Sequence, residues 1–105
     1  MQQFSVYKNR NAATRKEYPY LLNIQSDLLD ELKTVVVIPF IKKSVFKQKT
    51  IKYLMPVFTI ENKECVLLTP QIAGIPKSQL GTLIEDLSHF RSEIIGAMDF
   101  VISGI

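Results

Sequence analysis

The hydrophobic pattern of this chain changes period once, and the position of that change constrains the fold more than any other feature. Up to about residue 69, short segments alternate apolar and polar residues or are β-branched throughout, which is typical of strands. From Leu80 onward, apolar residues recur at steps of three and four, which is typical of an amphipathic helix. The polar connections are too short for crossover helices, which excludes a doubly wound parallel sheet. The sequence therefore predicts an α+β fold, mostly β, with an antiparallel sheet and one long C-terminal helix.

Five short segments have the composition of strands. They lie at residues 4–8, 18–25, 35–38, 54–60 and 65–69. Pro39 directly follows the third segment and predicts its end or a sheet edge, because proline cannot donate a ladder hydrogen bond. The polar residues 61–64, with Asn62 among them, predict a tight turn between the last two strands. The stretch 69–78 contains two prolines and a glycine, and we expect it to be irregular.

The expected helix covers about twenty residues and is roughly 30 Å long, enough to cross a small sheet. Its apolar stripe consists of Leu80, Leu83, Ile84, Leu87, Phe90, Ile94, Met98 and Val101. Thr82 and Glu85 have the spacing of a capping box, which predicts that the helix begins there. Gly104 lies where a left-handed helix cap would fall.

Two apolar segments are not explained by a core. Leu28 and Leu29 follow Ser26 and Asp27 in a segment too short for an independent helix, and we expect one turn that leaves both leucines partly exposed. The sequence ends in residues 100–105, which are almost wholly apolar. A terminus of this kind either folds back into the core or meets another protein, and a symmetric dimer would do both.

Length and composition predict a single domain over residues 1–105. Cys65 is the only cysteine, so an intrachain disulfide is excluded and nothing indicates an oxidising compartment. The first residues lack the basic start and apolar stretch of a secretory signal, and the longest apolar run is far shorter than the ~20 residues of a membrane span. We therefore expect a cytoplasmic protein.

Charge is distributed unevenly along the chain. Residues 1–53 carry ten Lys or Arg and four Asp or Glu, a balance of +6, whereas residues 54–105 carry three and six, a balance of −3. Five lysines lie between residues 42 and 52, and residues 32–60 contain no acid. Three interpretations remain open for this cluster: a solvated loop, a docking site for an acidic protein segment, or a nucleic-acid contact.

Residues with the chemistry of catalysis are scarce. His89 is the only histidine, so a paired-histidine metal site is excluded, and we expect a structural role for it on the helix. Cys65 begins a predicted buried strand and is interpreted as a core residue rather than a nucleophile. The four glycines share no phosphate-loop spacing. The sequence therefore predicts no catalytic residues, no metal and no cofactor.

Several short motifs occur in a fixed order along the whole chain. They are Gln3-Phe4 with Val6-Tyr7, residues 25–30 before Val37-Ile38-Pro39, Leu54 with Pro56-Val57 and Ile60, Thr69 with Ala73 and Ile75-Pro76, Gly81, residues 86–89, and Gly104-Ile105. In this order and spacing, the chain resembles the CcdB toxins of bacterial type II toxin–antitoxin modules. The resemblance runs from end to end, although no motif is diagnostic by itself.

The resemblance implies a homodimer built on an SH3-like antiparallel β-barrel, with a small additional sheet and a long C-terminal helix. It also implies that the protein is not an enzyme and contacts neither a membrane nor a specific nucleic-acid sequence. CcdB toxins bind the A subunit of DNA gyrase and trap the gyrase–DNA cleavage complex. A cognate CcdA-like antitoxin displaces them through a flexible C-terminal segment.

Carried over by position, the resemblance implies seven gyrase-binding residues. They are Leu28, Leu29, Asp99, Ile102, Ser103, Gly104 and Ile105. Across a dimer they would form one patch over the two-fold axis. Ser103 stands where the best-known family member has a tryptophan, and Asp99 where it has a neutral amide. Because an aromatic anchor can contribute ~2 kcal/mol or more, gyrase affinity is expected to be weaker, recovered by other contacts or directed at a different gyrase.

The basic loops are the predicted contacts of the antitoxin, because acidic disordered segments bind such loops with electrostatic steering. The predicted antitoxin-binding residues are Arg10, Arg15, Lys42, Lys43, Phe46 and Lys47. Two alternatives to a gyrase poison remain. One is an endoribonuclease toxin of the same barrel fold that uses arginine and hydroxyl groups, for which Arg10, Arg15 and Arg91 are widely spread. The other is a non-toxic homologue that only binds antitoxin.

Overall fold

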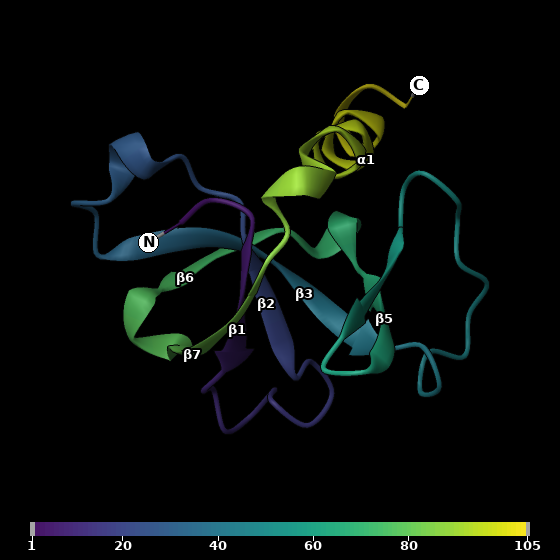
Figure 1. Ribbon diagram of the computed structural model, residues 1–105, viewed down its shortest axis with the longest axis horizontal. Coiled ribbons are helices and arrows are strands. Elements are labelled where there is room, and N and C mark those ends of the chain that lie inside the picture. The colour runs from purple at the N-terminus through teal and green to yellow at the C-terminus, as the bar shows by residue number, and fades with distance from the viewer. Residues whose placement is uncertain (1, 105) are drawn as a thin grey trace.

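Seven antiparallel strands and one C-terminal helix make up the computed structural model, which describes residues 2–104 (Figure 1). The strands are β1 (Ser5–Asn9), β2 (Tyr20–Asn23), β3 (Thr34–Lys42), β4 (Val57–Ile60), β5 (Lys63–Leu67), β6 (Ala73–Pro76) and β7 (Leu80–Asp86), and the helix is α1 (Arg91–Ser103). Four single 3₁₀ turns connect them: η1 (Asp27–Leu29), η2 (Thr69–Gln71), η3 (Lys77–Gln79) and η4 (Ser88–Phe90). The predicted mostly-β antiparallel fold with one C-terminal helix is confirmed.

The strands form one curled sheet in the order β4-β5-β3-β2-β1-β7, and β6 branches from it. The branch begins on β3, whose residues 34–37 pair with β6 while residues 40–42 pair with β5. The additional strands expected beside the barrel therefore take the form of a branch of the same sheet.

Pro39 lies inside β3, so the prediction that the strand ends or forms an edge there is wrong. Pro39 pairs with Leu21 of β2, and its carbonyl oxygen accepts a hydrogen bond from the Leu68 backbone N–H at 2.9 Å. The N and O of one strand residue point to the same side, so the missing N–H falls where β3 changes partner from β6 to β5. Proline costs little at this position because no ladder donor is needed there.

Residues 80–86 form β7, so the prediction that the helix begins near Leu80 with a Thr82–Glu85 capping box is wrong. β7 pairs with β1, and that pairing shifts register twice, between Val6 and Tyr7 and between Tyr7 and Asn9. Register shifts of this kind break the period of two, which explains why the apolar residues of β7 imitate a helical pattern.

The helix begins at Arg91, after a short turn that Asp86 stabilises by accepting a hydrogen bond from the Ser88 N–H at 2.8 Å. This hydrogen bond keeps the pKa of the exposed Asp86 carboxyl below its usual value. Gly104 ends α1 with a φ of 73° and donates to the Phe100 carbonyl at 2.9 Å, so the predicted left-handed cap is confirmed.

Both faces of the sheet are apolar. On one face, alternate residues of β2 and β3, such as Leu22, Ile38 and Phe40, pack with Ile94 of α1 in the main core. On the other face, Leu21 and Val37 belong to a second cluster, and Ile41 belongs to a third. The helix therefore covers only one side of the sheet, and the opposite side must be covered by β6, β7 and the loops.

The β4–β5 hairpin contains the tight turn that the polar residues 61–64 predict. Glu61 and Asn62 adopt φ values of 49° and 64°, and Ile60 pairs with Lys63, which together describe a two-residue turn of the primed type. The buried Tyr20 hydroxyl donates a hydrogen bond to the Glu61 carboxylate. Burial, followed by this acidic partner, raises the pKa of Tyr20 well above its usual value.

Among residues 2–104, no helix is both long and apolar enough to cross a lipid bilayer. The described part of the chain also places no group of three or more His, Cys, Asp or Glu side chains where they could hold a metal ion.

Candidate functional site

The leucine loop, residues 26–33 between β2 and β3, exposes apolar side chains from an ordered turn. The exposed fraction is 93% for Leu28 and 49% for Leu29, so the predicted exposure is confirmed. The Ser26 hydroxyl accepts a hydrogen bond from the Leu28 N–H at 3.2 Å and so starts the turn η1. Leu32, which the sequence interpretation did not single out, adds a third half-exposed leucine.

Buried Gln25 holds the leucine loop to the sheet. Its side-chain amide donates to the carbonyls of Leu29 and Thr34, and its side-chain oxygen accepts from the Val36 N–H, each at 3.2 Å. The side chain is 8% exposed, so these bonds are largely shielded from water. The exposed leucines are therefore presented on a fixed support, which lowers the entropy cost of binding a partner.

The end of α1 is the second part of the predicted gyrase-binding surface. Ile102 is 82% exposed and Asp99 is also exposed. The Ser103 hydroxyl donates to the Asp99 carbonyl at 2.8 Å, so it caps its own helix instead of facing a partner as an aromatic anchor would. Ile105 lies outside the described residues.

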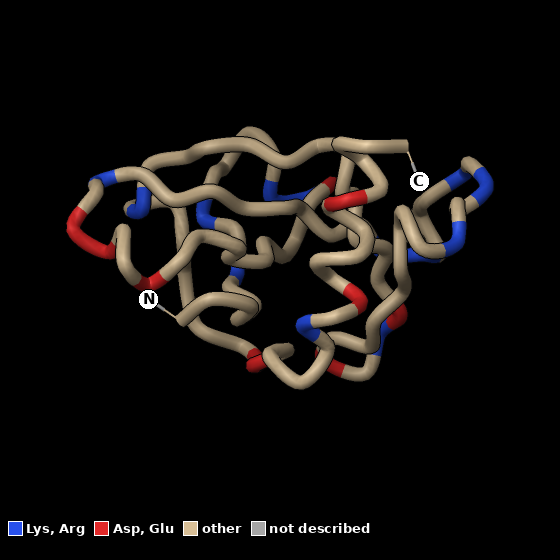
Figure 2. The backbone as a smooth tube through the Cα atoms, turned by 90° about the horizontal axis from the view of Figure 1, so that it is seen from above, with Lys and Arg blue, Asp and Glu red and all other residues tan. Residues whose placement is uncertain are grey.

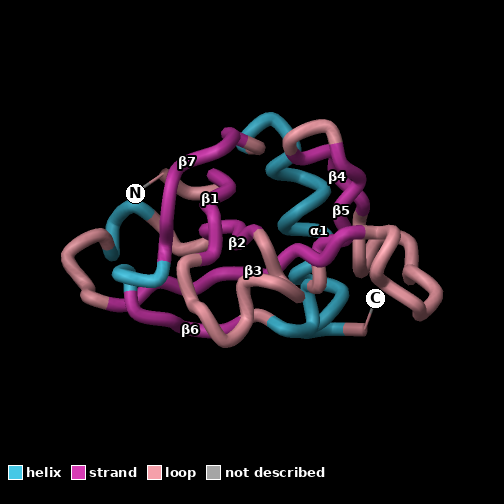
Figure 3. Tube along the Cα trace, turned by 90° about the horizontal axis from the view of Figure 1, so that it is seen from below, coloured by secondary structure: helices cyan, strands magenta, loops and turns pink. Residues whose placement is uncertain are grey.

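The leucine loop and the end of α1 lie far apart within one chain. In Figures 1 and 3 they are separated along the long axis of the molecule, whose extent is 36 Å, with the leucine loop at the left and the C-terminal end to the right. A single chain therefore does not bring the predicted gyrase-binding residues into one patch.

The lysine loop, residues 43–56 between β3 and β4, carries the basic cluster (Figure 2). Two turns shape it: the Phe46 N–H donates to the Lys42 carbonyl at 3.1 Å, and the Met55 N–H donates to the Ile51 carbonyl at 2.8 Å. Val45 and Ile51 are about half exposed despite their apolar side chains. The loop therefore combines positive charge with apolar surface, which is unusual for a purely solvated segment.

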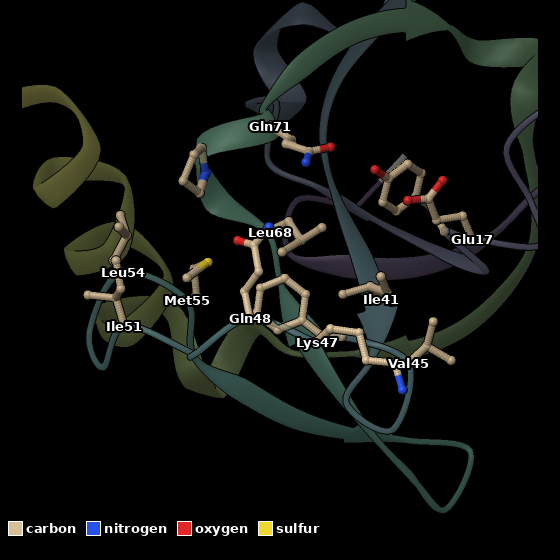
Figure 4. Close-up of a pocket in the computed structure, with 13 residues that line it drawn as sticks. Glu17, Ile41, Val45, Lys47, Gln48, Ile51, Leu54, Met55, Leu68 and Gln71 are labelled. Atoms are coloured by element: carbon tan, nitrogen blue, oxygen red, sulfur yellow. The ribbon is translucent and has the colours of Figure 1, made fainter.

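A groove of about 470 Å³ lies between the lysine loop, η2 and the end of β3 (Figure 4). Its lining comes from five separate stretches of the chain: Glu17 and Tyr18; Ile41; Val45, Phe46, Lys47 and Gln48; Ile51, Leu54 and Met55; and Leu68, Pro70 and Gln71. Most of these side chains are aliphatic or aromatic, and Lys47 and Glu17 are the charged ones. The groove is therefore mostly apolar, with the side-chain amides of Gln48 and Gln71 among the aliphatic side chains (Figure 4).

One further depression adjoins this groove, and another lies between the end of β3 and the β4–β5 turn. The second depression, of about 190 Å³, shares Tyr18 and Gln71 with it and extends over the outer face of the sheet. Its lining also includes Asn9, Asn11, Thr14, Leu21, Val37, Pro39, Ala73, Ile75 and Gln79. The lysine depression is lined by Lys42, Lys43, Ser44, Asn62, Lys63 and Glu64.

The predicted antitoxin-binding residues divide among these features. Phe46 and Lys47 line the groove, and Lys42 and Lys43 line the lysine depression. Arg10 lies beside Gly81, where a Cβ atom would approach the Arg10 side chain to 2.9 Å. Arg15 lines none of the three depressions. Of the groove residues in the acid-free lysine segment, the sequence predicted Phe46 and Lys47 as contacts and missed the apolar Val45, Ile51, Leu54 and Met55.

Cys65 is a core residue, whereas His89 is exposed in η4, so the expectation that it lies on the helix is wrong. Cys65 is fully buried in the main core, and burial raises the pKa of its thiol, so the interpretation as a core residue is confirmed. The ring of His89 lies 4.2 Å from that of Phe90, centroid to centroid, at the surface before α1. Neither environment provides an activated nucleophile.

The fold agrees with comparison to known proteins. The family described as CcdB protein matches residues 3–104. The chain belongs to the CcdB family. The end-to-end CcdB resemblance of the sequence is thereby confirmed.

Solved toxin structures have the same fold. "Mycobacterium tuberculosis toxin MazF-mt6" superposes with a TM-score of 0.74 at 14% identity, covering 93% of this chain and 95% of that one. An "Endoribonuclease in complex with its cognate antitoxin from Mycobacterial species" gives 0.73 at 14% identity, covering 97% and 94%. An "Endoribonuclease from Mycobacterial species" gives 0.72 at 13% identity, covering 97% and 90%. At these identities the likeness concerns the fold.

The expectation that the protein is not an enzyme is contradicted by these CcdB-fold neighbours, two of which are named endoribonucleases. The expectation rested on the family resemblance and on the scarcity of His and Cys constellations. A ribonuclease that works with arginine and hydroxyl groups leaves no such constellation in the sequence, so their scarcity does not exclude catalysis.

Proposed function

We propose that this CcdB-family protein is the toxin of a type II toxin–antitoxin module that binds the A subunit of DNA gyrase and traps the gyrase–DNA cleavage complex. The observation that carries the proposal is the nearly complete exposure of Leu28 on a loop fixed by buried Gln25. An exposed apolar side chain on a rigid support is characteristic of an interface anchor. Ile102 at the end of α1 supplies a second exposed apolar side chain.

The proposal includes a homodimer. The leucine loop and the end of α1 lie apart in one chain, so a two-fold axis is the simplest arrangement that unites them. Gyrase is engaged through its A subunit, and a two-fold toxin surface suits a target that is itself symmetric. Sedimentation of the purified chain tests this part separately.

A plasmid cleavage assay tests gyrase poisoning. Purified toxin, gyrase and supercoiled plasmid should yield linear DNA once the trapped complex is denatured. Leu28→Ser should lower the yield about tenfold or more, because it removes an anchor without disturbing the core. The matched control is Leu83→Ser, since Leu83 is a half-exposed leucine that lies on β7, outside the leucine loop. If the native chain yields no linear DNA and does not bind the gyrase A subunit, the proposal is wrong.

Endoribonuclease activity is a second candidate, supported by the names of the fold neighbours. The second depression contains the hydroxyl groups of Thr14 and Tyr18, and Arg10 lies nearby beside Gly81. A labelled single-stranded RNA incubated with the chain should be cleaved if this candidate holds, and Arg10→Ala or Arg15→Ala should abolish cleavage. RNA cleavage without plasmid linearisation would replace the gyrase proposal with this one.

A further inference from the structure

One edge of the curled sheet ends in β4, which pairs only with β5 in the described part of the chain. Because Ile60 closes the two-residue turn, its N–H and carbonyl point to β5, and every second residue does the same. The Pro56 carbonyl follows this pattern, since it accepts a hydrogen bond from the Leu67 N–H at 2.9 Å. Val57 and Thr59 therefore direct their backbone N–H and carbonyl groups away from β5, to the free edge of the sheet.

A hollow of about 370 Å³ runs along this free edge. It is lined by Val57, Phe58 and Thr59 of β4 and by Glu85, Leu87, Phe90 and Glu93 from the end of β7, η4 and the start of α1. We call it the edge hollow, and Figure 3 shows β4 and β7 on either side of the start of α1. None of the predicted gyrase-binding or antitoxin-binding residues lines it.

The edge hollow is apolar at its base and open at one end. Phe58 and Leu87, which line it, are almost completely buried, so they form its floor. A further cavity of about 570 Å³ between the lysine loop and α1 shares Val57 and Glu93 with it, so the hollow continues along the helix. A free strand edge beside an elongated apolar hollow fits an extended chain that adds a strand to the sheet.

The charge of the edge hollow selects the chemistry of that chain. Glu85 and Glu93 are the only charged residues in its lining. Within residues 2–104, no hydrogen bond or ion pair engages either carboxylate. Two unpaired carboxylates beside an apolar floor attract lysine and arginine, whose aliphatic stems can lie on apolar surface while their charged ends reach the acids. The same carboxylates repel acidic protein segments and nucleic-acid phosphates.

We infer that the free edge of β4 binds an extended basic segment of a partner protein as an additional antiparallel strand. Residues of that segment opposite Val57 and Thr59 exchange backbone hydrogen bonds with them. The residue opposite Phe58 faces the hollow, because cross-strand pairs share one face of a sheet. A lysine or arginine at that position lays its stem over Leu87 and carries its charge toward the two glutamates. The inference requires neither gyrase nor the antitoxin.

A backbone variant tests strand addition directly. The probe is a fluorescently labelled peptide of about eight residues in which Lys alternates with Val and Thr, and binding is measured by fluorescence anisotropy. Thr59→Pro should weaken binding more than about tenfold, because proline removes an N–H that faces the free edge. The fold should be retained, since no bond to β5 uses that N–H. Thr59→Val is the matched control, which keeps the N–H and should bind like the native chain.

A charge variant tests the choice of a basic segment. Glu85→Gln combined with Glu93→Gln should weaken binding of the same peptide about tenfold, because both carboxylates of the hollow become neutral. Glu64→Gln is the matched control, since Glu64 is an exposed glutamate on β5 outside the hollow. Circular dichroism of each variant verifies folding.

Four results would overturn the inference. The first is a native chain that does not bind the basic peptide, and the second is equal binding of a matched peptide with Glu in place of Lys. The third is a folded Thr59→Pro chain that binds like the native one. The fourth is self-association of the native chain in sedimentation that excludes the peptide and is lost in Thr59→Pro, which would assign the edge to a second copy.

Discussion

The leucine loop and the lysine loop expose apolar side chains by different means. Buried Gln25 fixes the leucine loop from below, and the loop carries Asp27, Asp30 and Glu31 against one lysine. The lysine loop is shaped by backbone turns and carries four lysines without an acid. One small sheet therefore presents two apolar surfaces of opposite charge, and each surface selects a different kind of partner.

The largest expected effect comes from removing the support of the leucine loop. Gln25→Ala should lower the free energy of unfolding by about 2 to 4 kcal/mol, because it leaves a cavity, deprives the Thr34 carbonyl and the Val36 N–H of this partner, and removes one of the two hydrogen bonds to the Leu29 carbonyl. Thermal denaturation and plasmid linearisation should both report the loss. Gln48→Ala, which alters an exposed glutamine of the lysine loop, should leave the melting temperature unchanged. If the two variants melt at the same temperature, the leucine loop and the lysine loop do not differ in how they are supported.

A reciprocal pair of variants tests whether the two surfaces act independently. Leu28→Ser should lower plasmid linearisation about tenfold and leave binding of the antitoxin unchanged, whereas Ile51→Asp, within the lysine loop of the predicted antitoxin contacts, should do the reverse. Added salt should weaken only antitoxin binding, because at about 1 M salt the Debye length is roughly 3 Å. If either variant lowers both readouts equally, the two loops form one surface.

A smaller effect is expected at the helix end, which is the other part of the proposed gyrase surface. Gly104→Ala should cost about 1 kcal/mol, because alanine is disfavoured at a φ of 73°. The melting temperature should therefore fall by about 4 to 8 °C. Binding of the antitoxin should be unchanged. Gly96→Ala, inside α1 with open space around it, should shift the melting temperature upward instead. A downward shift in both variants would point to tight packing around the whole helix.

The smallest effect is a loss of stability at high pH that comes from Tyr20 and is absent at neutral pH. Tyr20 begins β2, the strand that precedes the leucine loop, and its hydroxyl donates a hydrogen bond to Glu61, which lies beside the lysine depression. This hydrogen bond therefore connects the supports of both loops. Its folded-state pKa is raised above the ordinary value of 10.0, so the unfolded chain ionises first and stability falls as the pH rises above about 10. Chemical denaturation at pH values between about 8 and 11, a range that spans the ordinary tyrosine pKa, measures this loss of stability. Tyr20→Phe should be less sensitive to pH, although Cys65 retains part of the dependence.

Local patterns predicted some parts of the fold well. The alternation of Tyr20 and Leu22, the β-branched run of β3 and the polar turn at Glu61 and Asn62 all depend on neighbours in sequence. β7 was mistaken for a helix because its irregular pairing with β1 is not encoded in its own period. The strand β6 was missed because its pairing with β3 is a tertiary choice made within a segment rich in proline and glycine.

The candidate site likewise has a part that the sequence predicted and a part that it did not. The exposure of Leu28 and Leu29 follows from a short polar turn before two leucines, so the sequence was sufficient to predict it. The groove was not predictable, because Tyr18, Ile51 and Leu68 meet only through the register of β3 with its neighbours. The separation of the leucine loop from the helix end is likewise a property of the folded chain.

Strand β3 is the rigid connection between the two loops. It begins where the leucine loop ends and stops where the lysine loop begins, with nine residues between them. At about 3.3 Å per residue, it holds the two surfaces roughly 30 Å apart. A partner that engages only one loop leaves the other free, so one toxin can carry two different partners together unless one partner is long enough to cover that distance.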